Sequence, residues 1–153
     1  LVTMAERTDK EGGQSEAEII LGIPADTREA HFKSVSDMVD AGMKFIRMYQ
    51  FMMLPGTASS SMATRERHKI QTRYRVLPRC FGRYRIRDEE FPSAEIEEIS
   101  VGTNTLPYHH YQDCRDLNLT VEMINNDSIF AEVTQFLSQF GICSGTCGVT
   151  PSY

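Results

Sequence analysis

Two short apolar runs, separated by an amphipathic segment, form the earliest clear pattern in the chain. The run at 17–22 is short, apolar and closed by a glycine, which predicts a buried strand. The run at 44–50 is rich in aromatic and branched side chains and predicts a second strand. A strand, a helix and a second strand fit between residues 17 and 50, which is the length of a βαβ unit. The sequence therefore predicts two parallel strands joined by a right-handed crossover.

The segment between the two runs has the features of a capped helix. Asp26 is a good N-cap, and Glu29 stands three residues later, as in a capping box. Gly42 stands where a glycine commonly ends a helix. Apolar residues recur between these ends at helical spacing, and they are Phe32, Val35, Met38 and Val39.

The remainder of the chain is predicted to hold little strand. Residues 1–15 are a polar N-terminal loop, 61–92 a basic loop-rich segment and 141–153 a loose tail. Residues 93–140 are predicted as a mainly helical extension. Its three expected helices comprise one capped by Ser93 and carrying Ile96 and Ile99, one beginning near Pro107, and one over about 128–140.

Two parallel strands do not make a stable sheet, because such a sheet needs more neighbours and cover on both faces. We therefore expect further strands in a missing N-terminal part or in a partner. The chain begins with Leu1, as a partial sequence would.

The net charge of −5 is unevenly distributed. From Arg65 to Arg87 there are nine Lys or Arg residues and one acid, Glu66. This segment favours one of two readings: it docks on an anionic surface or RNA, making the chain a non-catalytic interaction module, or the acidic remainder screens it. No apolar run is long enough for a membrane span and the N-terminus does not look like a signal peptide, so a soluble, cytoplasmic protein is expected.

The cysteines and histidines do not predict a metal site. Cys143 and Cys147 are four residues apart, but Thr150 stands where a third cysteine would complete a cluster motif. His109 and His110 are adjacent, so on a helix they point in different directions. The other two cysteines, Cys80 and Cys114, are expected to be packing residues.

The loops that leave the two predicted strands are the candidate binding segments. Ligands gather at the carboxyl ends of parallel strands, and both a Gly22-Ile23-Pro24 turn and a Pro55-Gly56 turn belong there. The run 51–54, Phe-Met-Met-Leu, either offers an apolar surface to a purine ring or packs in the core. A different barrel enzyme that binds phosphate through the first turn is a further alternative, although that turn has one glycine and no following lysine.

Taken together, segments 18–27 and 49–57 resemble the late barrel strands of the radical S-adenosylmethionine (SAM) family. Members often read Glu/Asp-hydrophobic-Ile-X-Gly-Leu-Pro-Gly-Glu/Asp-Thr, then a helix, then Tyr-X-Leu-Met-Leu-Leu-Pro-Gly-Thr. The continuation at 73–79 is similar to the subgroup that carries an N-terminal cobalamin-binding domain. The resemblance covers about residues 14–140.

The resemblance implies an α/β fold in which residues 16–60 are the late βαβ part of a partial (β/α) barrel of radical SAM type, followed by a mainly helical C-terminal extension. It implies SAM and a [4Fe-4S] cluster as cofactors, and cobalamin in a parent protein of that subgroup. The catalytic residues and the substrate remain unidentified. The missing N-terminal half-barrel is the expected partner.

The resemblance also assigns positions around SAM. Glu18 matches an acidic residue that contacts the ribose, Gly22 and Pro24 match the turn beside SAM, and Met52 and Leu54 before Pro55 match the loop around the adenine. The chain departs from the pattern at Ala25, where glycine is common, and in lacking the Cys-X3-Cys-X2-Cys motif. Since the cluster ligands are not in this chain, the isolated chain is expected to be inactive.

Overall fold

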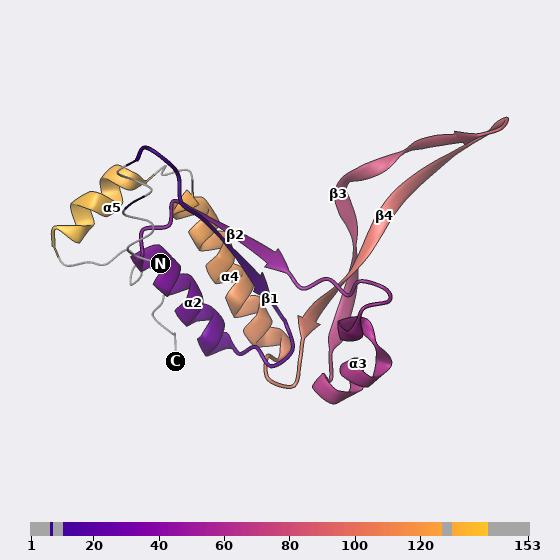
Figure 1. The fold of residues 1–153 in the computed structure, drawn as a ribbon, viewed down its shortest axis with the longest axis horizontal. Coiled ribbons are helices and arrows are strands. Elements are labelled where there is room, and N and C mark those ends of the chain that lie inside the picture. Colours follow the sequence, from indigo (N-terminus) through magenta and orange to yellow (C-terminus); the bar gives the residue numbers. More distant parts are fainter. Residues whose placement is uncertain (1–6, 8–10, 127–129, 141–153) are drawn as a thin grey trace.

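The computed structural model describes residue 7, residues 11–126 and residues 130–140. Figure 1 shows an α/β part that contains both sheet strands of the βαβ unit, and a long hairpin that points away from it. Within the described residues there are two sheets of two strands each, and no barrel closes. The elements in chain order are β1 (Glu16–Leu21), α2 (Arg28–Asp40), β2 (Phe45–Gln50), the 3₁₀ turn η1 (Ala58–Ser60), α3 (Met62–His68), β3 (Gln71–Ile86), β4 (Glu89–Gly102), α4 (Tyr108–Ile124) and α5 (Ala131–Ser138).

The predicted βαβ unit is confirmed. Strands β1 and β2 pair in parallel, with Glu16 opposite Phe45 at one end and Leu21 opposite Gln50 at the other. Within the described residues only one face of this sheet is covered, because α2 and α4 (Tyr108–Ile124) both pack on the same side of it (Figure 1). Ile20 points to the other side and is 48% exposed, so the expectation of fully buried strands is wrong for that face.

Helix α2 begins one residue later than predicted. Thr27 is the N-cap, and its hydroxyl accepts a hydrogen bond from the backbone N–H of Ala30. Asp26 does not cap the helix because its carboxylate accepts from the loop instead, at the N–H of Thr27 (2.9 Å). At the other end the prediction holds, since Gly42 follows the C-cap with a φ of +75°.

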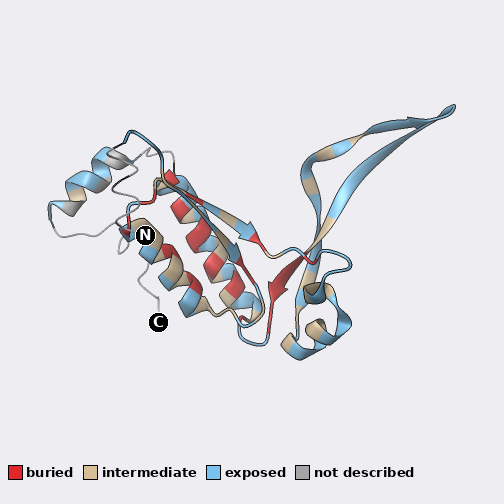
Figure 2. Ribbon diagram, in the orientation of Figure 1, coloured by how far each residue is buried: buried red, intermediate tan, exposed pale blue. Residues whose placement is uncertain are grey.

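Two apolar clusters hold the helices on the sheet. The first joins Val35 of α2 and Ile46 of β2 to Leu117 and Val121 of α4. The second joins Leu21 of β1 to the end of β4 and to α4. Figure 2 shows that the buried positions concentrate in α2, α4 and the last residues of β4. The predicted apolar face of α2 belongs to these clusters, and its members are Phe32, Val35, Met38 and Val39.

The hairpin overturns two predictions. The stretch 61–92 is not loop-rich, because it contains α3 and all of β3, and no helix follows Ser93, because β4 continues through it. The three-residue spacing of Ile96 and Ile99 suggested a helix, but Ile96 pairs with Val76 across two antiparallel strands. The aromatic and β-branched residues of this region therefore serve cross-strand pairing.

The later helices agree with the prediction in position. Helix α4 starts directly after Pro107, and α5 lies within the span expected for the last helix. The predicted N-terminal loop is described only at residue 7 and from residue 11 onward, and the predicted tail at 141–153 lies outside the described residues.

Candidate ligand-binding surface at the carboxyl edge of the sheet

The two predicted binding loops leave the sheet side by side. Leu21 and Gln50 are register partners at the ends of β1 and β2, and the N–H of Phe51 donates to the carbonyl of Leu21 (2.9 Å). Since the strands are parallel, the loops that contain Pro24 and Pro55 start from the same edge.

The loop after β1 is tightly built. Gly22 has a φ of +88°, and a Cβ there would lie 3.3 Å from the carbonyl oxygen of Ser100, so a side chain is disfavoured both by the backbone conformation and by the close contact. Ala25 also lies in the left-handed region, with a φ of +69°. Glycine, which the resemblance favours at this position, would relieve that strain. The hydroxyl of Thr105 donates to the carbonyl of Asp26 (2.6 Å) and ties the loop to the segment before α4.

The loop after β2 begins as an extended segment and ends in a turn. Met53 is buried and its N–H donates to the carbonyl of Glu98, whereas Met52 and Leu54 are 40% and 52% exposed. A turn follows, in which the N–H of Thr57 reaches the carbonyl of Leu54 (3.2 Å) and Gly56 has a φ of +82°. The run 51–54 is thus divided between core and surface.

Strand β4 forms a third element of this edge, which the sequence did not indicate. The N–H of Ser100 donates to the carbonyl of Phe51 (2.9 Å), and Met52 and Ile99 form an antiparallel bridge. Ser100 is fully buried, and its hydroxyl has no hydrogen-bond partner within the described residues. The end of β4 therefore covers the backbone of Gly22, which faces Ser100 and not an open space.

The uncovered face of the sheet carries a polar network. Alternation along β1 places Glu16, Glu18 and Ile20 on this face, and alternation along β2 places Arg47 and Tyr49 there. The Tyr49 hydroxyl lies 3.4 Å from a Glu18 carboxylate oxygen, and Arg47 forms an ion pair with Glu16. Hydrogen bonding to Tyr49 and to Glu16 raises the pKa of Arg47 above its usual value. Arg47 and Tyr49 were not predicted as site residues, although their alternate positions in the second run were a usable signal.

Exposed apolar side chains accompany this network where the strands end. Exposed apolar side chains close to polar groups are a feature of ligand and partner sites. The exposed fractions are 48% for Ile20, 41% for Ile23, 40% for Met52 and 52% for Leu54.

The six predicted SAM contacts all lie on β1, on β2 or on the loops that leave them, but they differ in accessibility. Glu18 is exposed on the open face, and Pro55 is exposed in its turn. Pro24 is half-buried, and Gly22 is buried. Met52 and Leu54 are accessible to a ligand, as described above.

The described residues contain no group of three or more His, Cys, Asp or Glu side chains that could hold a metal ion. Cys80 lies on the hairpin, and Cys114 is buried in α4. His109 and His110 have ring centroids 4.3 Å apart on the first turn of α4. Cys143 and Cys147 lie outside the described residues.

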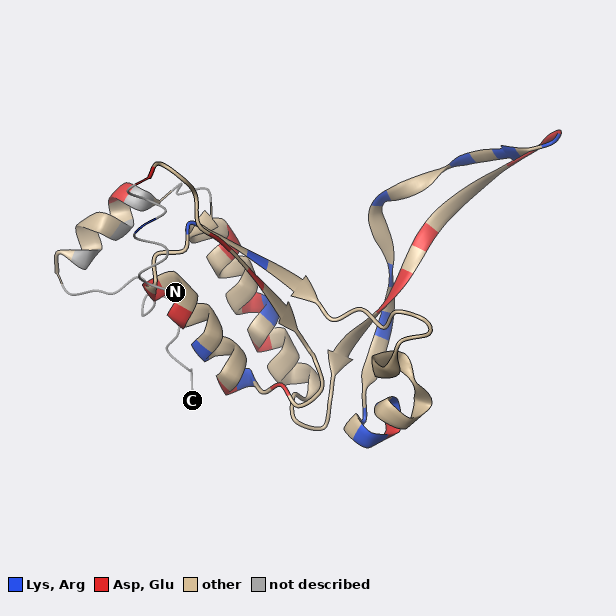
Figure 3. Cartoon of the chain, in the orientation of Figure 1, with Lys and Arg blue, Asp and Glu red and all other residues tan. Residues whose placement is uncertain are grey.

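The basic segment is divided between α3 and one strand of a charge-balanced hairpin. From Gln71 to Gly102 the chain has six arginines and six carboxylates, and Figure 3 shows the basic residues along β3 and acidic ones along β4. Arg75 is paired with Glu97, and Arg83 lies 3.5 Å from Glu90. Acidic residues of the opposite strand thus offset the positive charge.

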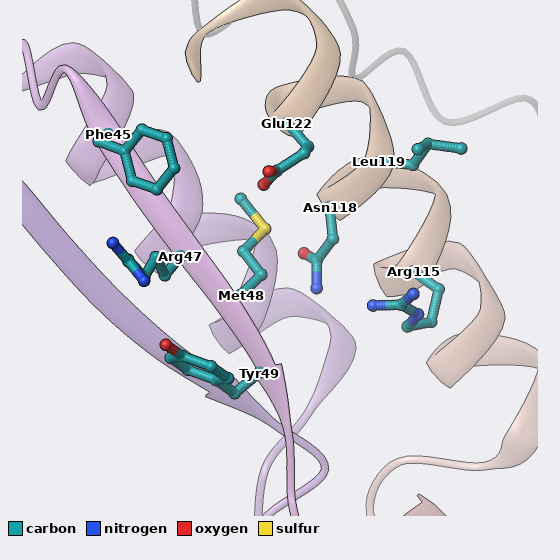
Figure 4. Close-up of a pocket in the computed structure, with 8 residues that line it drawn as sticks. All are labelled: Phe45, Arg47, Met48, Tyr49, Arg115, Asn118, Leu119 and Glu122. Carbon is teal, nitrogen blue, oxygen red and sulfur yellow. The ribbon is translucent and has the colours of Figure 1, made fainter. Parts of the chain in front are cut away.

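A cleft of about 380 Å³ lies between β2 and α4 (Figure 4). It extends round the outer edge of β2, so that residues of both faces of the sheet line it. The strand contributes Phe45, Arg47, Met48 and Tyr49, and the helix contributes Arg115, Asn118, Leu119 and Glu122.

Neither a family model nor a curated protein matches this chain. Among the described helices, none combines the length and the apolar character needed to cross a membrane.

Proposed function

We propose that this chain is the late part of a radical SAM barrel, and that the open face of the β1–β2 sheet, with its two outgoing loops, binds the nucleoside part of SAM. The observation that carries the proposal is the placement of Glu18. Its exposed carboxylate lies beside the Tyr49 hydroxyl on a face that no described element covers, four residues before the turn at Gly22.

The residues present suit a nucleoside. A carboxylate accepts hydrogen bonds from both hydroxyls of a ribose, and Tyr49 orients that carboxylate by donating to one of its oxygens. Met52 and Leu54 offer an apolar and polarisable surface to a purine ring. Gly22 shapes the loop by allowing it to pack on Ser100, so its role is to place neighbouring groups and not to contact the ligand through open space.

The polar open face also supports the assignment to a partial barrel. In such a barrel the strand faces opposite the helices point inward, and the active site lies at the carboxyl ends of the strands. Glu18, Arg47 and Tyr49 occupy those inward positions here. Further strands alongside β1 would enclose them.

The cluster does not fit the described cysteines, because Cys114 is buried and Cys80 lies on the hairpin. When SAM is bound at a [4Fe-4S] cluster, the cofactor pair supplies a 5′-deoxyadenosyl radical. In this proposal the chain's own residues bind and orient the nucleoside, and the cluster ligands come from elsewhere.

Calorimetric titration of the chain with SAM and with adenosine tests the proposal. Glu18→Gln should weaken binding about tenfold or more, because a hydrogen bond to a charged group is lost. Glu16→Gln is the matched control, since Glu16 lies on the same strand face two residues away and pairs with Arg47. Equal affinity of the two variants, or no saturable binding by the folded wild-type chain, would contradict the proposal.

Reconstitution with iron and sulfide tests the expected lack of activity. The isolated chain should show no [4Fe-4S] absorption band and should form no 5′-deoxyadenosine from SAM under reducing conditions. Appearance of both would show that this chain holds a cluster by itself.

An interaction module is the second candidate function, and the hairpin favours it. Tyr74, Phe81 and Ile96 are 66–71% exposed on the hairpin, and a two-stranded ribbon is marginally stable without a partner. Its balanced charge favours a protein partner over RNA. Filter binding of single-stranded RNA at low and physiological salt checks this: tight, strongly salt-dependent retention would restore the RNA alternative.

A further inference from the structure

The cleft between β2 and α4 begins where the helix closes the outer edge of the strand. The side-chain amide of Asn126 accepts from the N–H of Ile46 and donates to its carbonyl, both at 3.0 Å, as a neighbouring strand would. Asn125 adds a hydrogen bond to the carbonyl of Met43 (3.1 Å). These bonds fix the helix against the start of β2, and the cleft lies beyond them along the strand.

Asn118 brings an unsatisfied donor to this cleft. Asn118 is 3% exposed, and its Oδ1 accepts a hydrogen bond from Nε2 of His31 at 2.7 Å. Its Nδ2 has no hydrogen-bond partner within the described residues. A buried amide without a partner costs about 1 to 3 kcal/mol, so an acceptor at this position would be stabilising.

Arg115 brings a second donor from the same face of α4, three residues earlier. Its guanidinium forms no hydrogen bond or ion pair with another described residue. In Figure 4 its guanidinium extends toward the amide nitrogen of Asn118, beside Met48. Two donors, one of them charged, thus lie in the wall of the same cleft, and neither is paired with the Glu122 carboxylate that also lines it.

We propose that this cleft binds the carboxylate of a small organic acid with an apolar tail. Arg115 holds the carboxylate through its planar fork of N–H donors, and Nδ2 of Asn118 donates to one of the same oxygens. Phe45, Met48 and Leu119 line the remainder of the cleft and suit a hydrocarbon tail.

The charges around the cleft favour a single negative charge over a dianion. Glu122 lines the cleft on the next turn of the helix and accepts from Nδ2 of Asn126 at 2.9 Å. Arg47 also lines it but is paired with Glu16. Because Glu16 offsets the charge of Arg47 and the Glu122 carboxylate repels anions, inorganic phosphate should bind less well than a monocarboxylate.

This inference rests on donors that the proposed nucleoside surface does not use, although Arg47 and Tyr49 line the cleft and also lie on that surface. The two donors lie on α4, on the helix-covered side of the sheet, whereas Glu18 lies on the open side. A chain that fails to bind SAM can still bind the acid here, and the reverse also holds.

NMR titration of the isotopically labelled chain with hexanoate tests the proposal. Hexanoate in the millimolar range should cause saturable shifts of the amides around Met48, Arg115 and Asn118, whereas phosphate should not. Arg115→Gln and Asn118→Asp should each weaken binding about tenfold or more. Asn118→Asp keeps an oxygen for His31 while it replaces the Nδ2 donor.

Arg67→Gln is the matched control, because Arg67 is an exposed arginine on α3 and the change removes the same charge. It should leave hexanoate binding unchanged. Three outcomes would overturn the proposal: equal shifts with phosphate, unchanged affinity of Arg115→Gln for hexanoate, or no saturable shifts in the wild type. The last of these would mean that the cleft is filled by water alone. The guanidinium of Arg115 forms no hydrogen bond or ion pair with another described residue, so Arg115→Gln should fold normally. This variant therefore tests the proposal even if Asn118→Asp does not fold.

Discussion

Nε2 of His31 lies 2.7 Å from Oδ1 of Asn118, at the contact between α2 and α4. Both residues are almost fully buried, at 2% and 3% exposure, in an interface that also contains the more exposed ion pair of Arg28 with Asp113. A hydrogen bond in such surroundings requires both partners, because either one alone would be buried without an acceptor or donor. The pair therefore specifies how α4 packs on the βαβ unit, and it sets the orientation of the Asn118 amide that faces the cleft.

Replacing His31 with alanine should lower the free energy of unfolding by about 3 kcal/mol, since the change leaves a small cavity and strands the Asn118 oxygen. Urea unfolding followed by circular dichroism measures the change. Lys33→Ala is the control, because Lys33 is exposed on the same helix and forms only a surface ion pair with Asp37. That control should lose less than about 0.5 kcal/mol, and a similar loss in both variants would contradict the structural role of His31.

Local sequence features were sufficient to predict the βαβ unit. The strand runs, the glycine at 42 and the apolar face of α2 are each recognised within a short stretch of sequence, and all agree with the parallel register observed. Because parallel strands end at a common edge, the positions of Glu18 and of both loops also followed from the sequence. Thr27 was missed as the N-cap because both it and Asp26 are good capping residues. The structure distinguishes them, because the Asp26 carboxylate accepts a hydrogen bond within the loop, from the N–H of Thr27.

The hairpin was missed because its pattern depends on pairing between distant positions. Val76 and Ile96 face one another twenty residues apart, and most positions in the outer part of the ribbon are exposed. Without a buried face, the strands lack the alternation of apolar and polar residues that marks a strand in a sequence. The contact of Ser100 with Gly22 could not be anticipated once β4 had been predicted as a helix.

Ala25→Gly should stabilise the chain by about 1 kcal/mol. Ala25 has a φ of +69°, where a Cβ is strained and glycine is not, although the added freedom of glycine in the unfolded chain offsets part of the gain. The measurement is the urea midpoint at constant m-value. Ala30→Gly provides the contrast. Because Ala30 lies in the first turn of α2, this substitution should destabilise the chain by about 0.5 to 1 kcal/mol. A loss of stability in both variants would show that the strain at Ala25 is not released by glycine.

Glu98 should make stability depend on pH in the acid range. Arg65 forms two hydrogen bonds with its carboxylate, at 2.6 and 2.7 Å, and these bonds lower the pKa of Glu98 to about 2 against the opposing effect of burial. Because the pKa in the folded state is below the ordinary value of 4.5, the contribution is fully present above about pH 5 and is lost as the pH falls toward 2. The shift corresponds to about 3 kcal/mol at most.

Comparison of wild type with Glu98→Gln at several pH values measures that contribution. The difference in the free energy of unfolding in urea should be constant from about pH 5 to 7 and should shrink as the pH approaches 2. Arg65→Gln should remove most of the same dependence, because Arg65 is the largest cause of the lowered pKa. A difference that stays constant down to pH 2 would mean that Glu98 has an ordinary pKa in the folded chain.

Cys114 should resist thiol reagents until the chain unfolds. Cys114 lies in α4 and is fully buried against the end of β4. This burial, and to a smaller extent the nearby charge of Asp26, raises the pKa of the Cys114 thiol to about 12. At pH 8 the reactive thiolate is therefore about a thousandfold scarcer than for an ordinary cysteine.

A variant with Cys80, Cys143 and Cys147 changed to serine leaves Cys114 as the one thiol, and its reaction with a disulfide reagent can be followed by absorbance. Labelling should be slow in buffer and rapid in urea, whereas a variant that retains Cys80 in place of Cys114 should react faster in buffer, because Cys80 is partly exposed on the hairpin. Rapid stoichiometric labelling of Cys114 without denaturant would mean that α4 separates readily from the sheet, and the helix would then be a mobile cover and not part of the core.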